Sequence, residues 1–423
     1  MSKSKTIKET TDRGLCTGCG TCVSLCPHSA IKLTKDDSRG VYLPVIDDEV
    51  CNQCGICLDA CPGHRVNFKE LNESILGKEP EDILLGNYLN CYVGHAADCK
   101  IRYDSASGGL VTTLLSFALE KGVIDGALVT GMKKGNPLEP EPFIARTKEE
   151  ILSAAKSKYC PVPVNIALKE ILGSEGRYAV VGLPCHIQAV RKAERINVKL
   201  KERILLHFGL VCNHTPSFLA TEYLLQKLGI SKNQVSKINY RGKGWPGQMT
   251  ITLRNGDTKL VPFFSEPYWG VAFQSFFYPI RCTMCTDKIC ELADISFMDA
   301  WLPELSQDRV GESLIVLRNQ VGQELLQSAL TAGAVELEEV SGDKVIQSQS
   351  LALVRRQYSA RLSLLKKFRK GVPSYNQPLS KVKLTDYSGA ASLYLRTHVS
   401  ERRHLWFLIN WYSILWGLAR FSK

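Results

Sequence analysis

The chain has no apolar segment near its N-terminus. This absence affects whether its cysteines are expected to form disulfides or to bind metal. Residues 1–14 read MSKSKTIKETTDRG, which is polar throughout and lacks the hydrophobic core of an export signal. We therefore expect a reducing, cytoplasmic setting, in which disulfides rarely persist. The 16 cysteines of the 423-residue chain then point to metal binding or redox chemistry, and not to a secreted disulfide framework.

Net charge is nearly absent from most of the chain. Residues 351–423 contain 14 Lys and Arg residues against only Asp386 and Glu401, a net charge of +12. The whole chain carries +11, so residues 1–350 sum to −1 (+11 minus +12). A domain that binds nucleic acid usually presents a basic face, so we expect no nucleic-acid partner for the body of the protein.

No hydrophobic run is long enough to cross a membrane. The 15-residue apolar run within residues 404–421, HLWFLINWYSILWGLARF, would reach about 22 Å as a helix, short of the roughly 30 Å hydrocarbon core. Asn410, Ser413, Gly417 and Arg420 fall on one helical stripe, and aromatic residues cover most of the rest. This pattern is typical of a helix that lies on an anionic membrane surface. Docking of the helix onto the protein's own body or onto a partner is the alternative.

Cysteine itself is abundant, and eight of the cysteines recur in two copies of one pattern. Residues 16–27 read CTGCGTCVSLCP and residues 51–62 read CNQCGICLDACP, a constant offset of 35 residues. The spacing CxxCxxCxxxCP supplies three thiolates to one 4Fe-4S cluster and a fourth to the other cluster. Zinc sites are the alternative, but zinc modules typically use two separated CxxC pairs. The expected ligands are Cys16, Cys19, Cys22 and Cys61 for one cluster and Cys51, Cys54, Cys57 and Cys26 for the other.

The hydrophobic pattern divides the chain into three parts. Residues 1–70 form the two-cluster module, which resembles bacterial-type ferredoxins and has an expected hairpin around Ser38, Arg39 and Gly40. Over residues 84–350, helix-like and strand-like segments alternate, which predicts an α/β body with a mainly parallel sheet. A further antiparallel hairpin is expected at Asn255-Gly256. We expect an α+β ferredoxin-like module, an α/β flavin-binding body and a basic tail over residues 351–423.

Four cysteines of the body suggest a third cluster. Cys185 and Cys212 each follow an apolar run, AVVGL and ILLHFGLV, and so lie at the ends of predicted strands. If the strands share a parallel sheet, both thiols lie at the edge where open α/β sheets bind ligands. Cys282 and Cys285 form a CxxC pair shortly before the strand-like ADISFMD. Buried free cysteine is the alternative, because cysteine is common in protein cores.

A series of segments in the body resembles a known family. The segments YDSASGGLVTTLLSFAL, KSKYCPVPVN, AVVGLPCHIQAVRKA, GLVCNHTPSFLATEYL, YRGKGW and RCTMCTDKICELADISFMDAW occur in this order. They are similar to the beta subunit family of coenzyme F420 hydrogenases and dehydrogenases. This resemblance implies FAD beside a 4Fe-4S cluster on Cys185, Cys212, Cys282 and Cys285. In place of the family's usual cysteine-histidine-glycine, the chain has Cys212-Asn213-His214, which puts the neighbouring substrate contacts in question.

Several short stretches are candidates for holding the flavin. In SASGGLVTTLL, Ser105 or Ser107 can cap a helix, and two glycines allow a pyrophosphate to approach exposed amides at its positive end. KSKY offers a cation at Lys158, next to Ser157, although an isolated lysine is usually a solvated surface charge. YRGKGWPG places Arg241, Lys243 and Trp245 in what could equally be a plain surface turn. The expected cofactor-binding residues are Ser107, Gly108, Gly109, Ser157, Lys158, Gly182, Pro184 and Lys243.

These features predict an iron-sulfur flavoprotein oxidoreductase. One-electron carriers would feed a flavin that exchanges electron pairs with an unknown small-molecule substrate. The expected redox partner is reduced ferredoxin, the deazaflavin coenzyme F420 or a partner subunit. A non-catalytic electron-transfer subunit of a larger complex is a second hypothesis, and a zinc-stabilised interaction module is a third. We expect His186 and His214, which lie beside proposed cluster ligands, to be structural. The protein is expected in the cytoplasm, with possible peripheral contact to the membrane through its C-terminal helix.

Overall fold

The computed structural model describes residues 6–264, 267–368 and 371–412. Its N-terminal module contains the expected antiparallel hairpin, β1 (Ile31–Asp36) and β2 (Val41–Ile46). Two short helices follow the first cysteines of each motif, α2 (Thr21–Ser24) and α3 (Ile56–Asp59). Each begins after a left-handed glycine, Gly20 with φ 87° and Gly55 with φ 85°, where a side chain would be strained. The remaining elements of the module are α1 (Lys8–Asp12), β3 (Arg65–Val66) and α4 (Phe68–Leu76).

A twisted sheet of eight strands forms the centre of the body, in the order β14-β4-β13-β12-β8-β7-β5-β6. Four neighbouring strands, β12, β8, β7 and β5, run parallel to one another, and antiparallel pairs complete both edges. The predicted α/β fold with a largely parallel sheet is confirmed. The strands are β4 (Asn90–Ala96), β5 (Gly126–Lys133), β6 (Asn136–Ala145), β7 (Tyr178–Gly182), β8 (Ile204–Leu210), β12 (Ile295–Asp299), β13 (Ser313–Leu317) and β14 (Val335–Val340).

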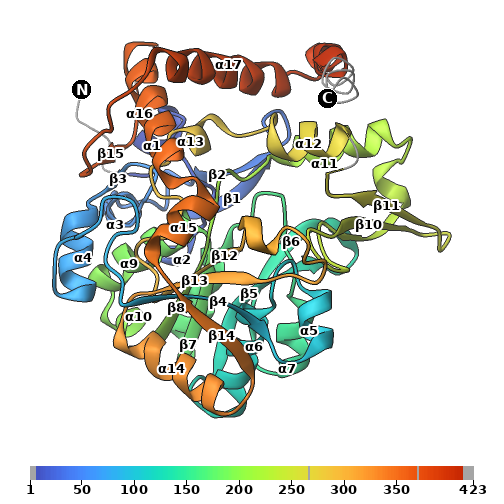
Figure 1. The fold of residues 1–423 in the computed structure, drawn as a ribbon. Helices are drawn as coiled ribbons and strands as arrows, with labels where there is room; N and C mark the ends of the chain where they lie inside the picture. Colours follow the sequence, from blue (N-terminus) through green and yellow to red (C-terminus); the bar gives the residue numbers. More distant parts are fainter. Residues whose placement is uncertain (1–5, 265–266, 369–370, 413–423) are drawn as a thin grey trace.

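Helices cover both faces of this sheet (Figure 1). On one face, α6 and α14 pack against the sheet through a core that includes Leu114 and Leu326. On the other face, α8, α9 and α10 pack through residues such as Ile171, Val190 and Leu200. The helices of the body are α5 (Cys99–Asp104), α6 (Leu110–Glu120), α7 (Lys148–Ser153), α8 (Leu168–Gly173), α9 (Pro184–Ile196), α10 (Val198–Arg203), α14 (Gln320–Thr331) and α15 (Gly342–Gln349).

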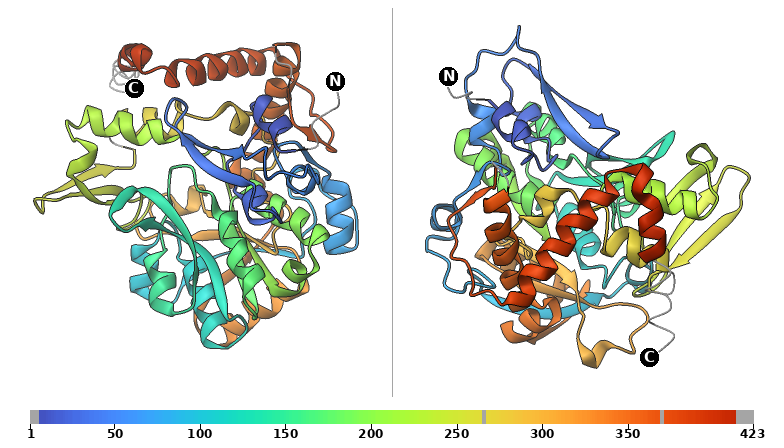
Figure 2. Two further views of the ribbon diagram at one scale, coloured as in Figure 1. Left: turned by 180° about the vertical axis from the view of Figure 1, so that it is seen from behind. Right: turned by 90° about the horizontal axis from the view of Figure 1, so that it is seen from above.

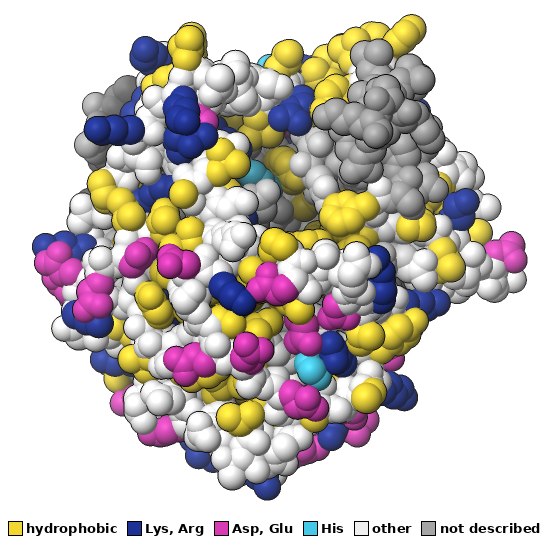
Figure 3. Space-filling view, in the orientation of Figure 1, with side chains coloured by type: hydrophobic (Ala, Val, Ile, Leu, Met, Phe, Trp, Pro, Cys, Tyr) yellow, Lys and Arg dark blue, Asp and Glu magenta, His cyan; other side chains and the backbone are white. Residues whose placement is uncertain are grey.

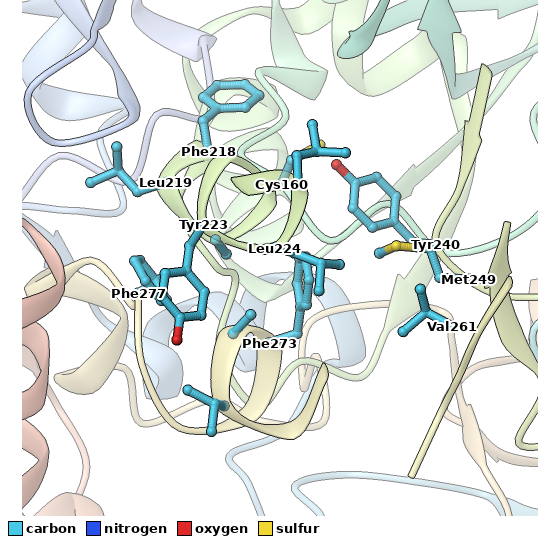
Figure 4. Close-up of a cluster of buried hydrophobic side chains, with 14 of the residues drawn as sticks. Cys160, Phe218, Leu219, Tyr223, Leu224, Tyr240, Met249, Val261, Phe273 and Phe277 are labelled. Carbon is cyan, nitrogen blue, oxygen red and sulfur yellow. The ribbon is translucent and has the colours of Figure 1, made fainter. Parts of the chain in front are cut away.

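A smaller lobe extends from the body (Figure 1). It contains a three-stranded antiparallel sheet and includes the hairpin predicted at Asn255-Gly256. An aromatic-rich cluster of buried side chains holds this lobe together, with Tyr223 and Phe277 near its centre (Figure 4). The elements are α11 (Phe218–Lys227), β9 (Val235–Asn239), β10 (Gln248–Leu253), β11 (Thr258–Pro262), α12 (Pro267–Gln274) and α13 (Ile280–Thr283).

The basic C-terminal segment crosses the molecule and packs on both other parts. It contains α16 (Leu351–Phe368), β15 (Ser374–Tyr375) and α17 (Leu384–Ser400). The two residues of β15 pair in parallel with β3, so the segment returns to the N-terminal module. Within the described residues, no helix is both long and apolar enough to span a bilayer.

The described part of the apolar C-terminal helix packs on the protein itself. Trp406 and Ile409 are buried in the cluster of the small lobe, and the Trp406 ring meets the Tyr223 ring edge-on at a centroid distance of 5.5 Å. Self-docking, the alternative to membrane contact, is therefore observed for this face of the helix. Of the polar stripe predicted from the sequence, Asn410 accepts a hydrogen bond from the Tyr223 hydroxyl at 2.9 Å. Ser413, Gly417 and Arg420 lie outside the described residues.

Candidate redox centres

The first cysteine set of the N-terminal module gathers in the predicted crossed arrangement. Burial raises the pKa of the Cys16 thiol, and the nearby thiols of Cys61 and Cys19 raise it further. The same neighbours, together with burial, raise the pKa of Cys22. Cys61 belongs to the second sequence motif but lies with the first three cysteines, as expected for two clusters that exchange their fourth ligand.

The second set gathers around Cys57. Burial raises the pKa of this thiol, the Ile7 N–H lowers it, and the thiols of Cys54, Cys51 and Cys26 raise it. Cys26 comes from the first motif, so the exchange is reciprocal. Backbone amides point at the sulfurs of two proposed ligands, with Ile7 N 3.3 Å from Cys57 Sγ and Ala30 N 3.3 Å from Cys26 Sγ. Such N–H donors stabilise the thiolate form of cysteine and help to set the reduction potential of a bound cluster. Cys54 is exposed, so this set is the more accessible of the two.

The body brings together the four cysteines proposed for a third cluster. Strands β7 and β8 are parallel neighbours in which Gly182 lies opposite Gly209. Cys185 and Cys212 each follow three residues after these paired glycines, so they emerge at the same sheet edge, as expected. Cys282 lies in α13 and Cys285 just after it. All four thiols line one cavity of about 230 Å³.

Burial dominates the electrostatics of this third set. It raises the pKa of Cys185, and the thiols of Cys19, Cys212, Cys282 and Cys285 raise it further. Burial likewise raises the pKa of Cys285 to about 11, although the neighbouring Arg281 guanidinium opposes the shift. Thiols in this setting are neutral without metal, and iron binding would displace their protons. Among the described residues, no three His, Cys, Asp or Glu side chains lie close enough to share a single metal ion.

The three cysteine sets form a continuous series. Cys57 of the second set lies near Cys22 of the first set, and Cys19 of the first set lies near Cys185 of the third set. The first set is therefore the middle one of the three. The order from the surface inward is therefore the set around Cys57, the set around Cys19, and the set in the body.

A buried cation that was not predicted from the sequence, Arg281, lies between the set around Cys19 and the set in the body. Arg281 donates from Nε to the Leu15 carbonyl at 3.1 Å and from Nη2 to the Pro62 carbonyl at 3.2 Å. Its charge lowers the pKa of both Cys16 and Cys282. The signal was its position directly before Cys282 in RCTMC. Arg281 thus joins the two modules and favours negative charge on both cysteine sets.

A larger cavity, of about 740 Å³, adjoins the cysteine cavity. The two share a wall made by residues at the ends of β7 and β8, and Figure 3 shows the surface hollowed beside α16 and below α17. Cys212 itself lines both cavities, so a group bound in the larger one would lie beside the third cysteine set. The shared residues are Val162, Leu183, His186, Cys212, Asn213, His214 and Thr215.

The larger cavity collects most of the predicted flavin residues. Those that line it are Ser107, Gly109, Ser157, Lys158 and Gly182. Pro184 lines the cysteine cavity instead. Gly108 and Lys243 line neither cavity. Gly108 is a close-packing residue, because a Cβ there would lie 2.5 Å from the Gly94 carbonyl oxygen.

The predicted serine cap of α6 is wrong. The N-cap is Gly109, which has φ 82° and no side-chain cap. Ser105 Oγ donates to the Ile101 carbonyl at 2.7 Å, and Ser107 Oγ donates to the Glu312 carbonyl at 2.6 Å. Because both hydroxyls bond elsewhere, no serine side chain occupies the first turn, and the N-terminal amides of α6 face the larger cavity without a cap.

Lys158, which was predicted to bind the cofactor, is half-buried and already hydrogen-bonded, so it is not the solvated surface charge that was the alternative. Its Nζ donates to the carbonyl oxygens of Ala154, Ala155 and Lys156, the last two at 2.9 Å. Burial lowers its pKa to about 7. Lys156 also lines the cavity and was not singled out from the sequence. Among the described residues, the Lys156 ammonium donates to no carbonyl oxygen, so it is freer than Lys158 to bind an anion.

The loop that could have been a plain surface turn is largely buried. Arg241 is 3% exposed and Trp245 8%. Arg241 forms an ion pair with Asp299 at 2.7 Å, and the Trp245 and Trp301 rings lie 4.5 Å apart. The surface-turn alternative is therefore wrong for these two residues, whereas Lys243 is exposed.

The two histidines beside the proposed cluster ligands differ in their surroundings. His186 accepts the Leu183 N–H at Nδ1, 3.1 Å away, and burial lowers its pKa to about 4, which agrees with a structural role at the start of α9. His214 stacks on Tyr278, with ring centroids 4.5 Å apart. Its Nε2 lies 3.2 Å from Arg361 Nη1. Since guanidinium only donates, Nε2 accepts and the proton of the neutral ring lies on Nδ1.

Known proteins match the chain over both its modules. Residues 91–169 and 175–343 match the N-terminal and C-terminal parts of the family described as coenzyme F420 hydrogenase/dehydrogenase, beta subunit. Residues 15–64 match the 4Fe-4S dicluster domain. The coenzyme F420 hydrogenase subunit beta of Methanosarcina barkeri is 30% identical over 271 residues, which are 62% of this chain and 85% of that protein.

Two further comparisons extend the match. The coenzyme F420-dependent sulfite reductase of Methanocaldococcus jannaschii is 27% identical over 348 residues, 79% of this chain and 49% of that protein. A chain in a solved structure of the F420-reducing NiFe hydrogenase complex from Methanosarcina barkeri matches with a TM-score of 0.54 and 26% identity, covering 70% of this chain and 98% of that one. The protein is thus an iron-sulfur relative of oxidoreductase subunits, and it belongs to the coenzyme F420 hydrogenase/dehydrogenase beta subunit family.

Proposed function

We propose that this chain is an iron-sulfur flavoprotein oxidoreductase that transfers electrons between a redox partner and a small-molecule substrate. The cofactors of this proposal are three 4Fe-4S clusters and one FAD. Clusters carry single electrons, and a flavin exchanges them for electron pairs. The observation that carries the proposal is the shared wall at Cys212, since this cysteine lines both the four-cysteine cavity and the larger cavity beside it.

The residues of the larger cavity fit a flavin dinucleotide. Its volume of about 740 Å³ is of the size of cofactor sites, roughly 300–1,000 Å³. At one end, the uncapped amides of α6 at Gly109 and the ammonium of Lys156 would hold a diphosphate. Near the shared wall, His214 Nδ1 is buried with no hydrogen-bond partner among the described residues, and it could donate to a polar ring atom. Ser107, Ser157, Lys158 and Gly182 would shape the cavity around the group.

The N-terminal module would supply the route for electrons from a partner. Cys54 of the outermost cysteine set is exposed, so a reduced ferredoxin or a partner subunit could approach there. The relatives named for coenzyme F420 favour a deazaflavin as an alternative donor or acceptor, which would meet the flavin directly. We propose that these reactions occur in the cytoplasm, with the C-terminal segment in peripheral contact with the membrane.

A second candidate is a non-catalytic electron-transfer subunit of a larger complex. Two of the proteins that match the chain favour it, because one is described as a subunit and the other lies in a hydrogenase complex. Turnover by the isolated chain separates the two candidates. If reduced deazaflavin is oxidised with a viologen acceptor at catalytic rates, the chain is an enzyme by itself. Complete loss of turnover, with restoration by a partner subunit, would favour the second candidate.

Cofactor content after anaerobic reconstitution tests the proposal. We expect about twelve iron atoms per chain, four for each cluster, together with one FAD. Cys212→Ala should lower the iron content to about eight, whereas Cys290→Ala should leave it unchanged. Cys290 is a matched control because it is fully buried nearby yet lines neither cavity. An iron content near eight in the wild type would remove the third cluster, and absence of any flavin would overturn the flavoprotein assignment.

A further inference from the structure

Helix α17 presents an apolar stripe to solvent. Leu384 is 87% exposed and Leu395 64%, and Tyr387 lies on the same side of the helix. The opposite side is buried, with Ala390 and Leu393 facing the protein. A surface helix normally buries its apolar side and exposes polar residues. This helix has apolar residues on both sides, so its outer stripe could contact a second apolar surface outside the protein.

A second apolar patch follows in the residues after α17. Phe407 is 53% exposed and Trp411 66%, and Leu408 and Tyr412 are exposed beside them. Figure 1 places α17 along the top of the molecule with these residues at its end, and the view from above in Figure 2 shows both on one side. The two patches therefore lie on one side of the protein, and we call them together the upper face.

Ion pairs and hydrogen bonds join the upper face to α16 and to the smaller lobe beneath it. The Arg356 guanidinium bonds Asp386 of α17 at 2.6 Å. Trp406 Nε1 donates to the Ser400 carbonyl at 2.9 Å, and Arg403 forms an ion pair with Glu222 at 2.5 Å. With their inner sides fixed by these contacts, the two helical segments cannot turn their outer apolar side chains inward.

The charges around the upper face are almost all positive. Residues 351–423 contain 14 Lys and Arg residues but only two carboxylates, and Asp386 is already paired with Arg356. Lys366, Lys367, Lys381 and Lys383 are all exposed. Figure 3 shows hydrophobic and basic side chains together along the upper edge. Protein interfaces are depleted of lysine, whereas aromatic residues among lysines suit the surface of an anionic bilayer.

We propose that the upper face attaches the protein reversibly to anionic lipid membranes. The proposal rests on the peripheral contact included in the proposed function, but it does not depend on the redox chemistry. It extends the contact from the C-terminal helix, which includes residues 407–412, to α17. The apolar side chains of both segments enter the interface while the lysines meet the lipid phosphates. The inner side of α17 lines the cysteine cavity through Tyr394 and Thr397, so attachment would place the third cysteine set close to the membrane surface.

Liposome flotation of the reconstituted holoprotein tests this surface. Vesicles of phosphatidylcholine with about one third phosphatidylglycerol are compared with pure phosphatidylcholine, because each basic residue adds affinity only for anionic lipid. We expect wild type to float with anionic vesicles at least 10-fold more than with neutral ones, and less at high salt. The double variant L384S/L395S should lose most of this binding. The control I83S/V198S changes two residues that are equally apolar and 52% and 65% exposed, outside the C-terminal segment, and should float like wild type.

Several results would overturn the proposal. Flotation of L384S/L395S equal to wild type, or equal binding of wild type to neutral and anionic vesicles, would exclude the upper face as an anionic-lipid site. Sedimentation without lipid is measured in parallel: a dimer that L384S/L395S dissociates would assign the face to self-association instead. Iron and flavin contents of the same samples report on the proposed redox function separately, since a variant that keeps both cofactors but does not float has lost only membrane contact.

Discussion

Arg281 Nη2 donates a hydrogen bond to the hydroxyl of Tyr375 at 2.7 Å. Arg281 precedes a proposed cluster ligand, and Tyr375 belongs to the short strand β15 of the C-terminal segment. The same guanidinium bonds carbonyls of the N-terminal module at Leu15 and Pro62. One buried cation therefore ties together all three parts of the chain at the boundary between two cysteine sets.

Replacement of Arg281 should weaken both stability and electron transfer. Arg281→Met leaves the Leu15 and Pro62 carbonyls unpaired and should destabilise by roughly 3 kcal/mol, whereas Tyr375→Phe, which removes one hydrogen bond, should cost about 1 kcal/mol. Loss of the cation should also make the reduction potentials of the neighbouring centres more negative. Chemical denaturation and redox titration measure the two effects. An unchanged potential in folded R281M would contradict the electrostatic role.

The proposed order of the redox centres predicts the behaviour of a Cys185 variant. Cys185→Ala should leave the N-terminal cysteine sets loaded and reducible by a low-potential donor, while flavin reduction through them slows by orders of magnitude. The reason is that Cys185 belongs to the set between Cys19 and the larger cavity. Rapid mixing with reduced ferredoxin, followed at flavin and cluster wavelengths, gives both rates. Cys99→Ala, an exposed thiol, is the control, and normal flavin reduction in C185A would show that Cys185 is only a core thiol.

The buried network around His207 predicts how stability depends on pH. His207 Nε2 lies 2.6 Å from Glu194 and Nδ1 3.0 Å from Asp294. Burial and Arg191 oppose protonation of His207, but the two carboxylates outweigh them and raise its pKa. A histidine whose pKa is raised on folding contributes its full stabilisation of the folded state below its unfolded pKa, near 6.5. That stabilisation is lost as the pH rises through the folded pKa. Unfolding temperature should therefore fall from neutral toward alkaline pH.

A His207→Gln variant checks the source of this pH dependence. It should be less stable by roughly 3 kcal/mol at neutral pH, because two buried carboxylates lose one of their two cations and keep only Arg191. Its unfolding temperature should also vary less between pH 6.5 and 9 than that of wild type, since no buried histidine deprotonates. A variant that keeps the full alkaline decline would assign the decline to other groups.

Two glycine variants separate backbone strain from close packing. Gly20 has φ 87°, and a Cβ there would lie 2.5 Å from the Ile166 side chain and 3.0 Å from its backbone nitrogen. Gly77 has φ 73° with nothing within 4 Å of such a Cβ. Gly77→Ala should therefore lower the free energy of unfolding by about 1 kcal/mol, the strain of a side chain in the left-handed conformation. Gly20→Ala should cost about 1–3 kcal/mol more, measured by denaturant unfolding. Equal costs would mean that the contact with Ile166 relaxes freely.

Sequence patterns predicted features that depend on neighbouring residues. The 35-residue offset predicted the exchange of Cys26 and Cys61 because the ligand spacing is local to each loop. The apolar runs before Cys185 and Cys212 predicted a shared sheet edge because parallel strands end together, and Gly182 indeed lies opposite Gly209. In both cases the backbone geometry is regular, so residue spacing along the chain determines which side chains meet in the folded site.

Features that depend on distant partners were not predictable in the same way. Ser107 looked like a helix cap, but its hydroxyl bonds a carbonyl 205 residues away at Glu312. Lys158 was predicted to bind the cofactor, yet its ammonium bonds the carbonyls of Ala155 and Lys156 in the loop after α7. The aromatic C-terminal helix has apolar residues around most of its circumference, so its sequence could not show that Trp406 and Ile409 face the protein. Tertiary packing decided each case, and single-sequence periodicity contains no information about it.

The parallel pairing of β15 with β3 joins residues 374–375 to residues 65–66 and so fixes an order of events during synthesis. A ribosome makes the chain from its N-terminus, and all twelve proposed ligand cysteines lie at or before residue 285. Helix α17, which lines the cysteine cavity, begins only at Leu384. Every thiol is therefore made before the segment that covers it, and the nascent protein passes through a stage in which the cavity still lacks its last wall.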